Sequence, residues 1–165
     1  MTLRIRDYCS TDATALNETV LLAFQQYSTQ FNEWETFCER IGSMSLLSKE
    51  SEIIVAEYQG VLCGAVAYYA PGKDKTDYFP KDWASVRLLV VNPEYRGKGA
   101  GRALMNELVL RAKKDSSPTI GLHTSNIMEV ALSMYQRMGF KKIKGIQPIH
   151  GVPYSTYELD LREKL

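Results

Sequence analysis

One junction constrains the fold of this chain more than any other part of its sequence. An apolar segment rich in valine and leucine ends at Val90-Val91-Asn92-Pro93, where proline removes a donor from any strand ladder. Three glycines follow at every second position (Gly97, Gly99 and Gly101), and an amphipathic helical pattern then begins. The sequence therefore predicts a buried strand that turns through a glycine-rich loop into a helix.

This loop is suited to bind an anion. Glycines let successive backbone N–H groups point into one concavity, and the dipole of the following helix adds positive potential. A pyrophosphate group fits such a site, and Arg96, Lys98 and Arg102 can place full charges at its rim. The alternative is an ordinary glycine-rich turn whose basic side chains are only solvated.

Two other phosphate-binding signatures do not fit the loop. A P-loop needs serine or threonine after its lysine, but Lys98 is followed by glycine. The dinucleotide fingerprint needs Gly-x-Gly-x-x-Gly, and the three glycines here have a different spacing.

The rest of the chain alternates between strand and helix patterns. Strands are expected at residues 2–6, 52–58, 61–69, 83–91, 119–124, 141–146 and 154–161. Four helices are expected: one after the N-cap candidates Ser10–Asp12, one after an Asn32–Glu35 capping box, one from the three glycines to about residue 114, and one at 127–138. This order predicts an α+β fold with α/β-type layers: a mixed, mostly antiparallel central sheet of about six to seven strands with about four helices on both faces. A single domain is expected over residues 1–165.

Composition excludes several classes of function. The 20 basic and 19 acidic side chains give a formal charge of +1, so no overall field attracts nucleic acid or an anionic membrane. No run of eighteen apolar residues and no signal peptide are visible, and a cytoplasmic protein is expected. The three cysteines lack metal-ligand spacing, so no metal is expected.

With these features described, a resemblance is apparent. The run from Arg96 to Gly101, RGKGAG, resembles the Arg/Gln-x-x-Gly-x-Gly/Ala signature of the GNAT family, the GCN5-related N-acetyltransferases. Residues 89–95 look like the strand and entry segment of that family, and the pattern Ala131-x-x-x-Tyr135-x-x-x-Gly139-Phe140 resembles its second conserved helix. The resemblance covers essentially the whole chain.

The resemblance implies an enzyme that uses acetyl-coenzyme A as cosubstrate. It implies that the strand opens from its neighbour to hold the pantetheine arm, and that the loop wraps the pyrophosphate. Tyr135 matches the tyrosine that protonates the departing thiolate. The cofactor-binding residues would be Leu89, Val90, Val91, Arg96, Gly97, Lys98, Gly99, Ala100, Gly101 and Arg102.

Two positions depart from the family pattern. Met128 stands where many relatives have asparagine, and Asn126, with Glu129 three residues on, is better interpreted as a helix N-cap. Ser85 stands where relatives often have a glutamate that acts as general base. The base therefore stays open between Asp82, Glu129, His123 and a water chain past Ser85.

The acceptor is expected to be an amine of a small molecule, a peptide or a protein, and a homodimer is left open. Several aromatic residues could wall an acceptor pocket, although core packing explains them equally well: Tyr27, Phe31, Trp34, Tyr68, Tyr69, Tyr78 and Phe79. The expected function is N-acetylation by direct attack of the amine. The alternative is an acyl-coenzyme A-binding sensor or scaffold without catalysis.

Overall fold

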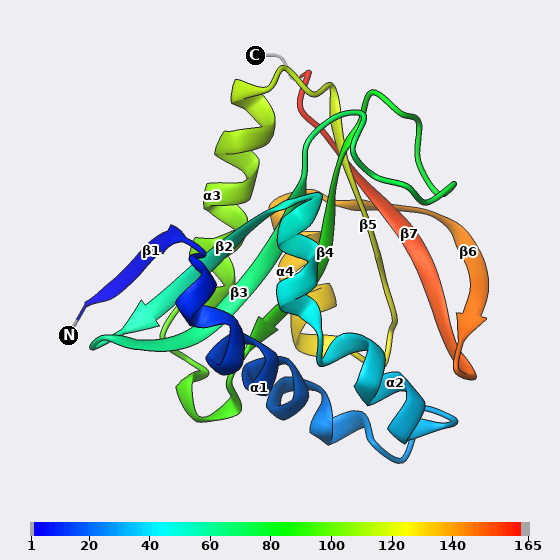
Figure 1. Ribbon diagram of the computed structural model, residues 1–165. Coiled ribbons are helices and arrows are strands. Elements are labelled where there is room, and N and C mark those ends of the chain that lie inside the picture. The colour runs from blue at the N-terminus through cyan, green and yellow to red at the C-terminus, as the bar shows by residue number, and fades with distance from the viewer. Residues whose placement is uncertain (1, 163–165) are drawn as a thin grey trace.

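The computed structural model describes residues 2–162, which build one seven-stranded sheet flanked by helices (Figure 1). The strands are β1 (Leu3–Asp7), β2 (Glu52–Tyr58), β3 (Val61–Tyr69), β4 (Ala84–Val91), β5 (Thr119–Thr124), β6 (Lys141–Ile149) and β7 (Val152–Asp160). The helices are α1 (Ala13–Phe24), α2 (Trp34–Ile41), α3 (Ala100–Lys114) and α4 (Glu129–Met138). The predicted fold class is confirmed.

The sheet has the order β1-β2-β3-β4-β5-β7-β6, and its described strands pair antiparallel except for β4 with β5. That parallel pair is short. It joins only Ala84 to Ile120 and Ser85 to Gly121, so the rest of β4 has a ladder partner only on the β3 side. The two strands thus separate in the middle of the sheet.

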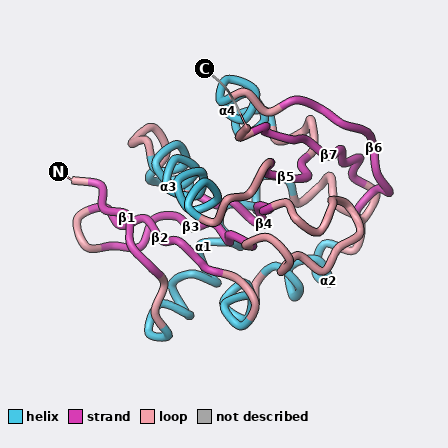
Figure 2. Tube along the Cα trace, turned by 90° about the horizontal axis from the view of Figure 1, so that it is seen from above, coloured by secondary structure: helices cyan, strands magenta, loops and turns pink. Residues whose placement is uncertain are grey.

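Each face of the sheet carries its own core. Successive side chains of a strand point to opposite faces, so Ile53 and Val55 of β2 pack under α1 and α2, while Ile54 and Ala56 pack with α3 and α4. Figure 2 shows α3 and α4 on one side of the sheet and α1 on the other. The opening between β4 and β5 therefore lies between two packed layers.

The capping box predicted at the start of α2 is wrong. Glu33 occupies the N-cap position with φ 54°, and no side chain caps the helix. Asn32 instead donates its backbone N–H to the His150 carbonyl at 2.7 Å, in the turn between β6 and β7. A tertiary contact thus fixes the entry to α2 and overrides the local capping signal.

No helix within residues 2–162 combines the length and the apolarity needed to cross a bilayer.

Candidate acetyl-coenzyme A and amine site

A β-bulge lies in β4 where the strand leaves β5. Ala65 pairs with Val90 and Ala67 with Arg87, so β4 has one residue more than β3 between these pairs. Leu88, inside the bulge, has φ 56°, a conformation that a branched side chain adopts only under constraint. Bulges increase local twist and redirect side chains, so this one accompanies the separation of β4 from β5.

The glycine-rich loop has the conformation expected of an anion site. Gly97 and Gly99 have φ of 81° and 84°, and a Cβ on either would meet no other atom within 4 Å. Gly99 is the N-cap of α3, and the Ala103 N–H donates to its carbonyl at 3.0 Å. The amides of residues 100–102 precede this bond, so the first turn of α3 presents free donors beside open space.

The three basic side chains of the loop diverge. The Lys98 Nζ lies 4.8 Å from the centre of the Tyr58 ring. Arg102 is exposed on the flank of α3, beside a groove shared with α4. Arg96 is exposed and lies near Tyr27. Burial raises the pKa of Tyr27, and the Arg96 charge partly offsets that rise. The loop therefore offers backbone amides, rather than converging cations, to an anion.

Tyr135 lies in the core on α4, with 5% of its surface exposed and its ring edge-on to Phe140 at 5.7 Å. Burial raises the pKa of its hydroxyl well above the usual range. Within the described residues the hydroxyl makes no hydrogen bond, whereas every fully buried side-chain nitrogen or oxygen there has a partner. The Tyr135 hydroxyl therefore keeps access to solvent, as a donor to a ligand must.

The segment before α4 differs from the prediction. Met128, not Asn126, occupies the N-cap position, and its side chain is buried with its sulfur 3.8 Å from the Thr124 hydroxyl. Asn126 is exposed, and the local turn is instead stabilised by Ser125, whose Oγ accepts from the Ile127 N–H at 3.3 Å. The predicted N-cap role of Asn126 is therefore wrong.

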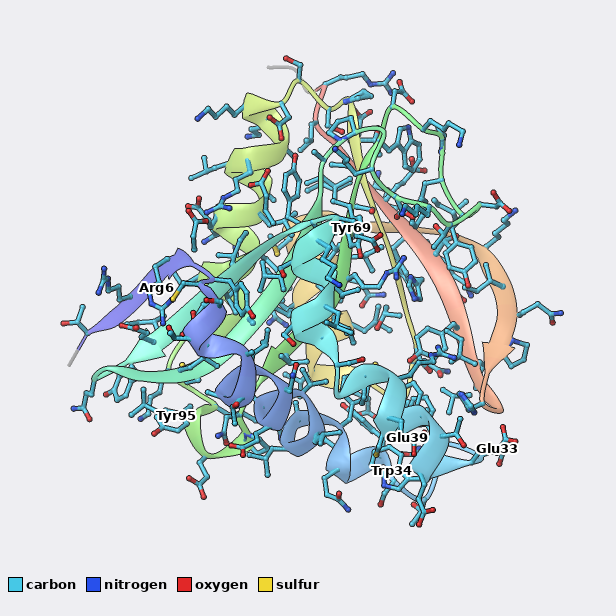
Figure 3. All side chains as sticks on the ribbon, viewed as in Figure 1. Arg6, Glu33, Trp34, Glu39, Tyr69 and Tyr95 are labelled. Atoms are coloured by element: carbon cyan, nitrogen blue, oxygen red, sulfur yellow. The ribbon has the colours of Figure 1, made fainter. Side chains whose placement is uncertain are left out.

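A cavity of about 420 Å³ lies on the α1–α2 side of β4. Phe24, Phe37, Met44, Leu88, His123 and Tyr154 are among the side chains that line it. The aromatic residues predicted for such a pocket are distributed differently, because adjacent residues of a strand face opposite sides. Tyr69 lies on the cavity face of the sheet (Figure 3), and its hydroxyl donates to Glu50 at 3.0 Å. Tyr68 lies on the opposite face, and its hydroxyl donates to Asp115 at 2.7 Å.

Other predicted aromatics support the cavity rather than line it. Phe31 is stacked on Phe37 with centroids 4.1 Å apart. Tyr78 packs edge-on to His123 at 5.1 Å, and Phe79 is stacked on Trp83. The aromatic walls of the cavity are thus Phe24, Phe37 and Tyr154, which the sequence analysis did not predict as pocket residues. Predicted aromatic residues such as Phe31 pack behind them.

The comparisons with known proteins agree with this geometry. Residues 15–140 match the Acetyltransferase (GNAT) family. The chain belongs to the GNAT family. Over 88 residues it is 34% identical to N-acetyltransferase family 8 member 3 of Rattus norvegicus, a match that takes in 53% of this chain and 37% of that longer protein.

Solved structures have the same GNAT fold. PaiA N-acetyltransferase from Thermoplasma acidophilum, in complex with coenzyme A, is similar with a TM-score of 0.79 and 20% identity, covering 97% of this chain and 99% of that one. A GNAT family acetyltransferase from Brucella melitensis, in complex with acetyl-coenzyme A, has a TM-score of 0.67 and 18% identity over 99% and 91% of the two chains.

Of the base candidates in this GNAT chain, Asp82 and Glu129 are exposed and Ser85 is buried. His123 lines the cavity, but burial, with the Arg87 charge adding to it, lowers the pKa of His123 to about 4. His123 is therefore only a weak base at neutral pH. The described residues also contain no group of three or more His, Cys, Asp or Glu side chains that could hold a metal ion.

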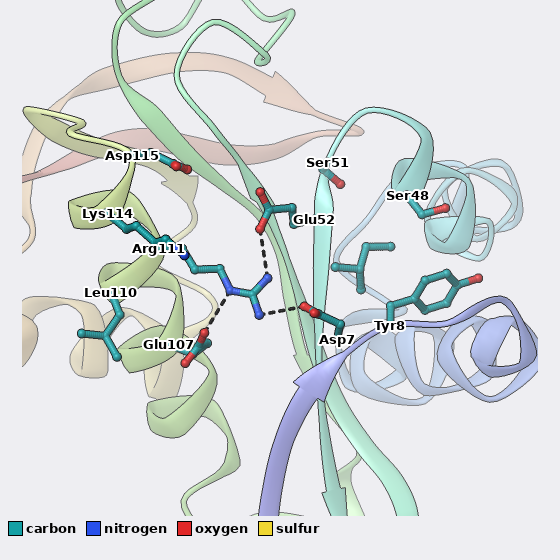
Figure 4. A pocket seen from close by; sticks show the side chains of 11 residues that line it. Asp7, Tyr8, Ser48, Ser51, Glu52, Glu107, Leu110, Arg111, Lys114 and Asp115 are labelled. Atoms are coloured by element: carbon teal, nitrogen blue, oxygen red, sulfur yellow. Dashed lines mark hydrogen bonds and ion pairs between the residues drawn. The ribbon is translucent and has the colours of Figure 1, made fainter.

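A wider groove, of about 730 Å³, lies away from the loop and the bulge (Figure 4). Arg111 of α3 crosses it and pairs with Asp7 at 2.8 Å, Glu52 at 3.0 Å and Glu107 at 3.0 Å. The Arg111 guanidinium is thus fully paired with carboxylates. Its ion pairs with Asp7 and Glu52 tie α3 to the β1–β2 edge of the GNAT sheet. We assign this groove a structural role.

Proposed function

We propose that this GNAT chain transfers the acetyl group of acetyl-coenzyme A to an amine by direct attack. The observation that carries the proposal is the continuous path from the unpaired part of β4 to the free amides at the start of α3. Both ends of this path offer unpaired backbone groups, as an elongated, pyrophosphate-containing ligand requires.

The residues present fit such a ligand. The backbone N–H groups from Gly97 to Arg102 would hold the pyrophosphate, and the free side of Leu89, Val90 and Val91 would hold the pantetheine amides. Acetyl-coenzyme A supplies an acetyl group that is already activated as a thioester. The pantetheine arm would run back along β4 from Val91, so the thioester would lie near the bulge at Leu88.

The amine would enter from the cavity on the α1–α2 side and attack the thioester carbonyl carbon. A C–N bond forms, the C–S bond breaks, the amine nitrogen releases a proton, and the sulfur leaves as a thiolate. The Tyr135 hydroxyl would donate a hydrogen bond to that sulfur. Because burial raises the pKa of Tyr135 further above that of a thiol, a hydrogen bond fits better than complete proton transfer.

A covalent acetyl-enzyme is less consistent with this site. It needs a nucleophile such as a thiolate with a base beside it. Burial raises the pKa of both Cys38 and Cys63, so they remain thiols at neutral pH. Direct attack on the thioester needs no such group.

The test is to incubate the protein with acetyl-coenzyme A and a broad panel of small amines and peptide N-termini, and to follow free thiol. With the best acceptor, double-reciprocal plots of initial rates should intersect. Parallel lines together with a trapped acetyl-enzyme would contradict direct attack. Tight binding of acetyl-coenzyme A without turnover of any amine would favour a sensor, a function with which Met128 at the usual asparagine position is consistent.

A further inference from the structure

The cavity on the α1–α2 side contains a cation whose hydrogen-bonding capacity is almost unused. Arg87 of β4 lines the cavity, with 28% of its side chain exposed. Its nearest acidic contact is the Asp74 Oδ1, 3.9 Å from its Nη2, which is too long for a hydrogen bond. Across residues 2–162 the guanidinium donates no hydrogen bond, although it carries five N–H donors.

The two carboxylates beside Arg87 are already committed to other donors. Asp74 accepts from the Thr76 N–H and hydroxyl, both at 2.7 Å, and from the Ser85 hydroxyl. Glu50 accepts from the Tyr69 hydroxyl at 3.0 Å and pairs with the Lys75 Nζ at 3.1 Å. Neither carboxylate therefore accepts a hydrogen bond from the guanidinium, although Asp74 lies within ion-pair distance of it.

The position of Arg87 is nevertheless fixed. Its guanidinium carbon lies 5.2 Å from the centre of the Tyr69 ring, a cation–π contact. Stacking on an aromatic face leaves the N–H groups at the edge of the guanidinium, where a planar carboxylate can accept two parallel hydrogen bonds. The site thus presents a fixed guanidinium whose N–H groups can donate to a planar carboxylate.

The place of this receptor defines what it would bind. Arg87 directly precedes Leu88, next to which the thioester and the attacking nitrogen would lie. An acceptor with a short linker between its amine and its carboxylate would suit this arrangement. Part of the remaining wall is apolar and includes Phe24, Phe37, Met44 and Leu88.

The charge of the cavity agrees with an anionic group. Besides Arg87, Arg40 and Lys49 line the cavity, and Glu50 is the one carboxylate among its lining residues. An amine without a carboxylate would bring a further positive charge beside Arg87 and would leave the Arg87 donors unpaired in the cavity.

We infer that Arg87 binds the carboxylate of the acceptor and that the acceptor is a free apolar α-amino acid. This inference rests on the proposed acetyl transfer and adds the substrate class. Arg87 is thus a specificity-determining residue, and the apolar wall accommodates the amino acid side chain.

The experiment compares acceptors that differ only in the carboxylate. L-phenylalanine, L-leucine and L-methionine are assayed beside their amides, and phenylalanine beside phenethylamine, with thiol release as the readout. The unmodified protein should use each free amino acid with a kcat/KM about ten- to a hundredfold higher than that of its amide, mainly through KM. Equal values for acids and amides, or a preference for the amides, would overturn the inference but leave acetyl transfer intact. Failure to acetylate any amine would overturn the proposed function itself.

Variants locate the preference. Arg87→Gln should remove the advantage of the acids and raise kcat/KM for phenethylamine, because the positive charge beside that amine is gone. Arg87→Lys should restore the advantage of the acids only in part. Arg4→Gln, on the exposed outer strand, is the matched control and should behave as the parent. A uniform loss for acids and carboxylate-free amines in Arg87→Gln would refute a role in carboxylate binding.

A binding measurement supplies a readout that needs no turnover. Calorimetry on protein saturated with coenzyme A should show that N-acetyl-phenylalanine binds at least tenfold more tightly than N-acetyl-phenethylamine. That difference should vanish in Arg87→Gln, after circular dichroism confirms that the variant is folded. Equal affinity of the two products in the unmodified protein would contradict the inference even if the variant proved unstable.

Discussion

The Ser85 hydroxyl donates a hydrogen bond to the carboxylate of Asp74, eleven residues earlier in the chain. Ser85 is buried at the start of β4, and Asp74 belongs to the loop between β3 and β4. Ser85 stands where the family resemblance leads us to expect a glutamate, and its hydroxyl contacts a carboxylate from the loop. The bond anchors the loop beside the point where β4 leaves β5.

Asp74 is expected to position the loop rather than to act as the base. Burial alone would raise the pKa of Asp74, but the hydrogen bonds from Ser85 and Thr76, with Arg87 adding to them, outweigh it and lower the pKa. Asp74→Asn should reduce the free energy of unfolding by about 1–3 kcal/mol, because charge-assisted bonds are lost. Turnover should fall less than about tenfold, since a carboxylate with a lowered pKa is a weak base.

Urea denaturation and thiol-release assays check this prediction. Asp77→Asn, an exposed aspartate in the same loop, is the control and should match the parent in both. A loss of turnover by several powers of ten with unchanged stability would instead assign Asp74 to proton transfer.

The stability of the fold should depend on pH through His123. Burial, with Arg87 adding to it, lowers the pKa of His123 to about 4, whereas an unfolded histidine titrates near ~6.5. Between these values the unfolded chain binds a proton that the folded chain does not, so the free energy of unfolding falls as the pH drops from about 6.5 to about 4. The loss should approach roughly 3 kcal/mol.

His123→Gln should flatten this part of the stability curve, measured by denaturant titration at a series of pH values. His150→Gln is the control, since His150 is the other histidine of the chain and lies in the turn between β6 and β7. An unchanged slope in His123→Gln would show that this imidazole does not cause the pH dependence.

Local signals in the sequence predicted much of the fold. The turn Gln59-Gly60 has φ of 54° and 81°, the two positive values that a tight hairpin requires, and the strands on either side have the predicted bounds. Gly139 ends α4 with φ 107°, as expected of a residue after a helix. Such features depend on a few neighbouring residues, which the sequence shows directly.

Features that depend on distant segments were not predicted. The N-cap of α2 is set by the turn at His150, and the bulge at Leu88 depends on the register between β3 and β4. Arg87 carries no motif, so only the structure shows that it lies over Tyr69 at the cavity. The glycine-rich loop was visible because it is contiguous, whereas the cavity on the α1–α2 side is assembled from five separate parts of the chain.

Acetyl-coenzyme A binding should depend on the loop glycines. Gly99→Asp and Gly101→Asp should each weaken binding at least about tenfold, because a carboxylate would repel the pyrophosphate. At Gly99 the positive φ adds backbone strain, whereas a Cβ at Gly101 would make ordinary contacts of 3.8 Å with Met134 and Val91. Arg96→Ala should weaken binding less, since the amides remain.

Calorimetry on folded variants checks the loop. Gly72→Asp is the matched control, because Gly72 has φ 85° and open space around it but lies in the loop between β3 and β4. The Gly72→Asp variant should lose about as much stability as Gly99→Asp does, while its affinity for acetyl-coenzyme A should stay unchanged. Unchanged affinity in both Gly99→Asp and Gly101→Asp would move the pyrophosphate site elsewhere.

The last prediction concerns Tyr135, the residue proposed to stabilise the leaving thiolate. Tyr135→Phe keeps the ring against Phe140 and removes a hydroxyl that has no partner among the described residues, so the fold should lose little stability. Turnover should fall by roughly one to three powers of ten, and the affinity for acetyl-coenzyme A should stay nearly constant, because the lost hydrogen bond forms mainly in the transition state.

The assay uses the best acceptor at saturating acetyl-coenzyme A, after a pre-steady-state burst experiment confirms that chemistry limits the rate. Tyr157→Phe is a suitable control, because Tyr157 is buried in the same core cluster on β7 but is not proposed to reach the thioester. Equal turnover in Tyr135→Phe and its parent would remove Tyr135 from the mechanism. The cofactor site would survive that result, because it depends on the amides of the Gly97–Arg102 segment and not on the phenol.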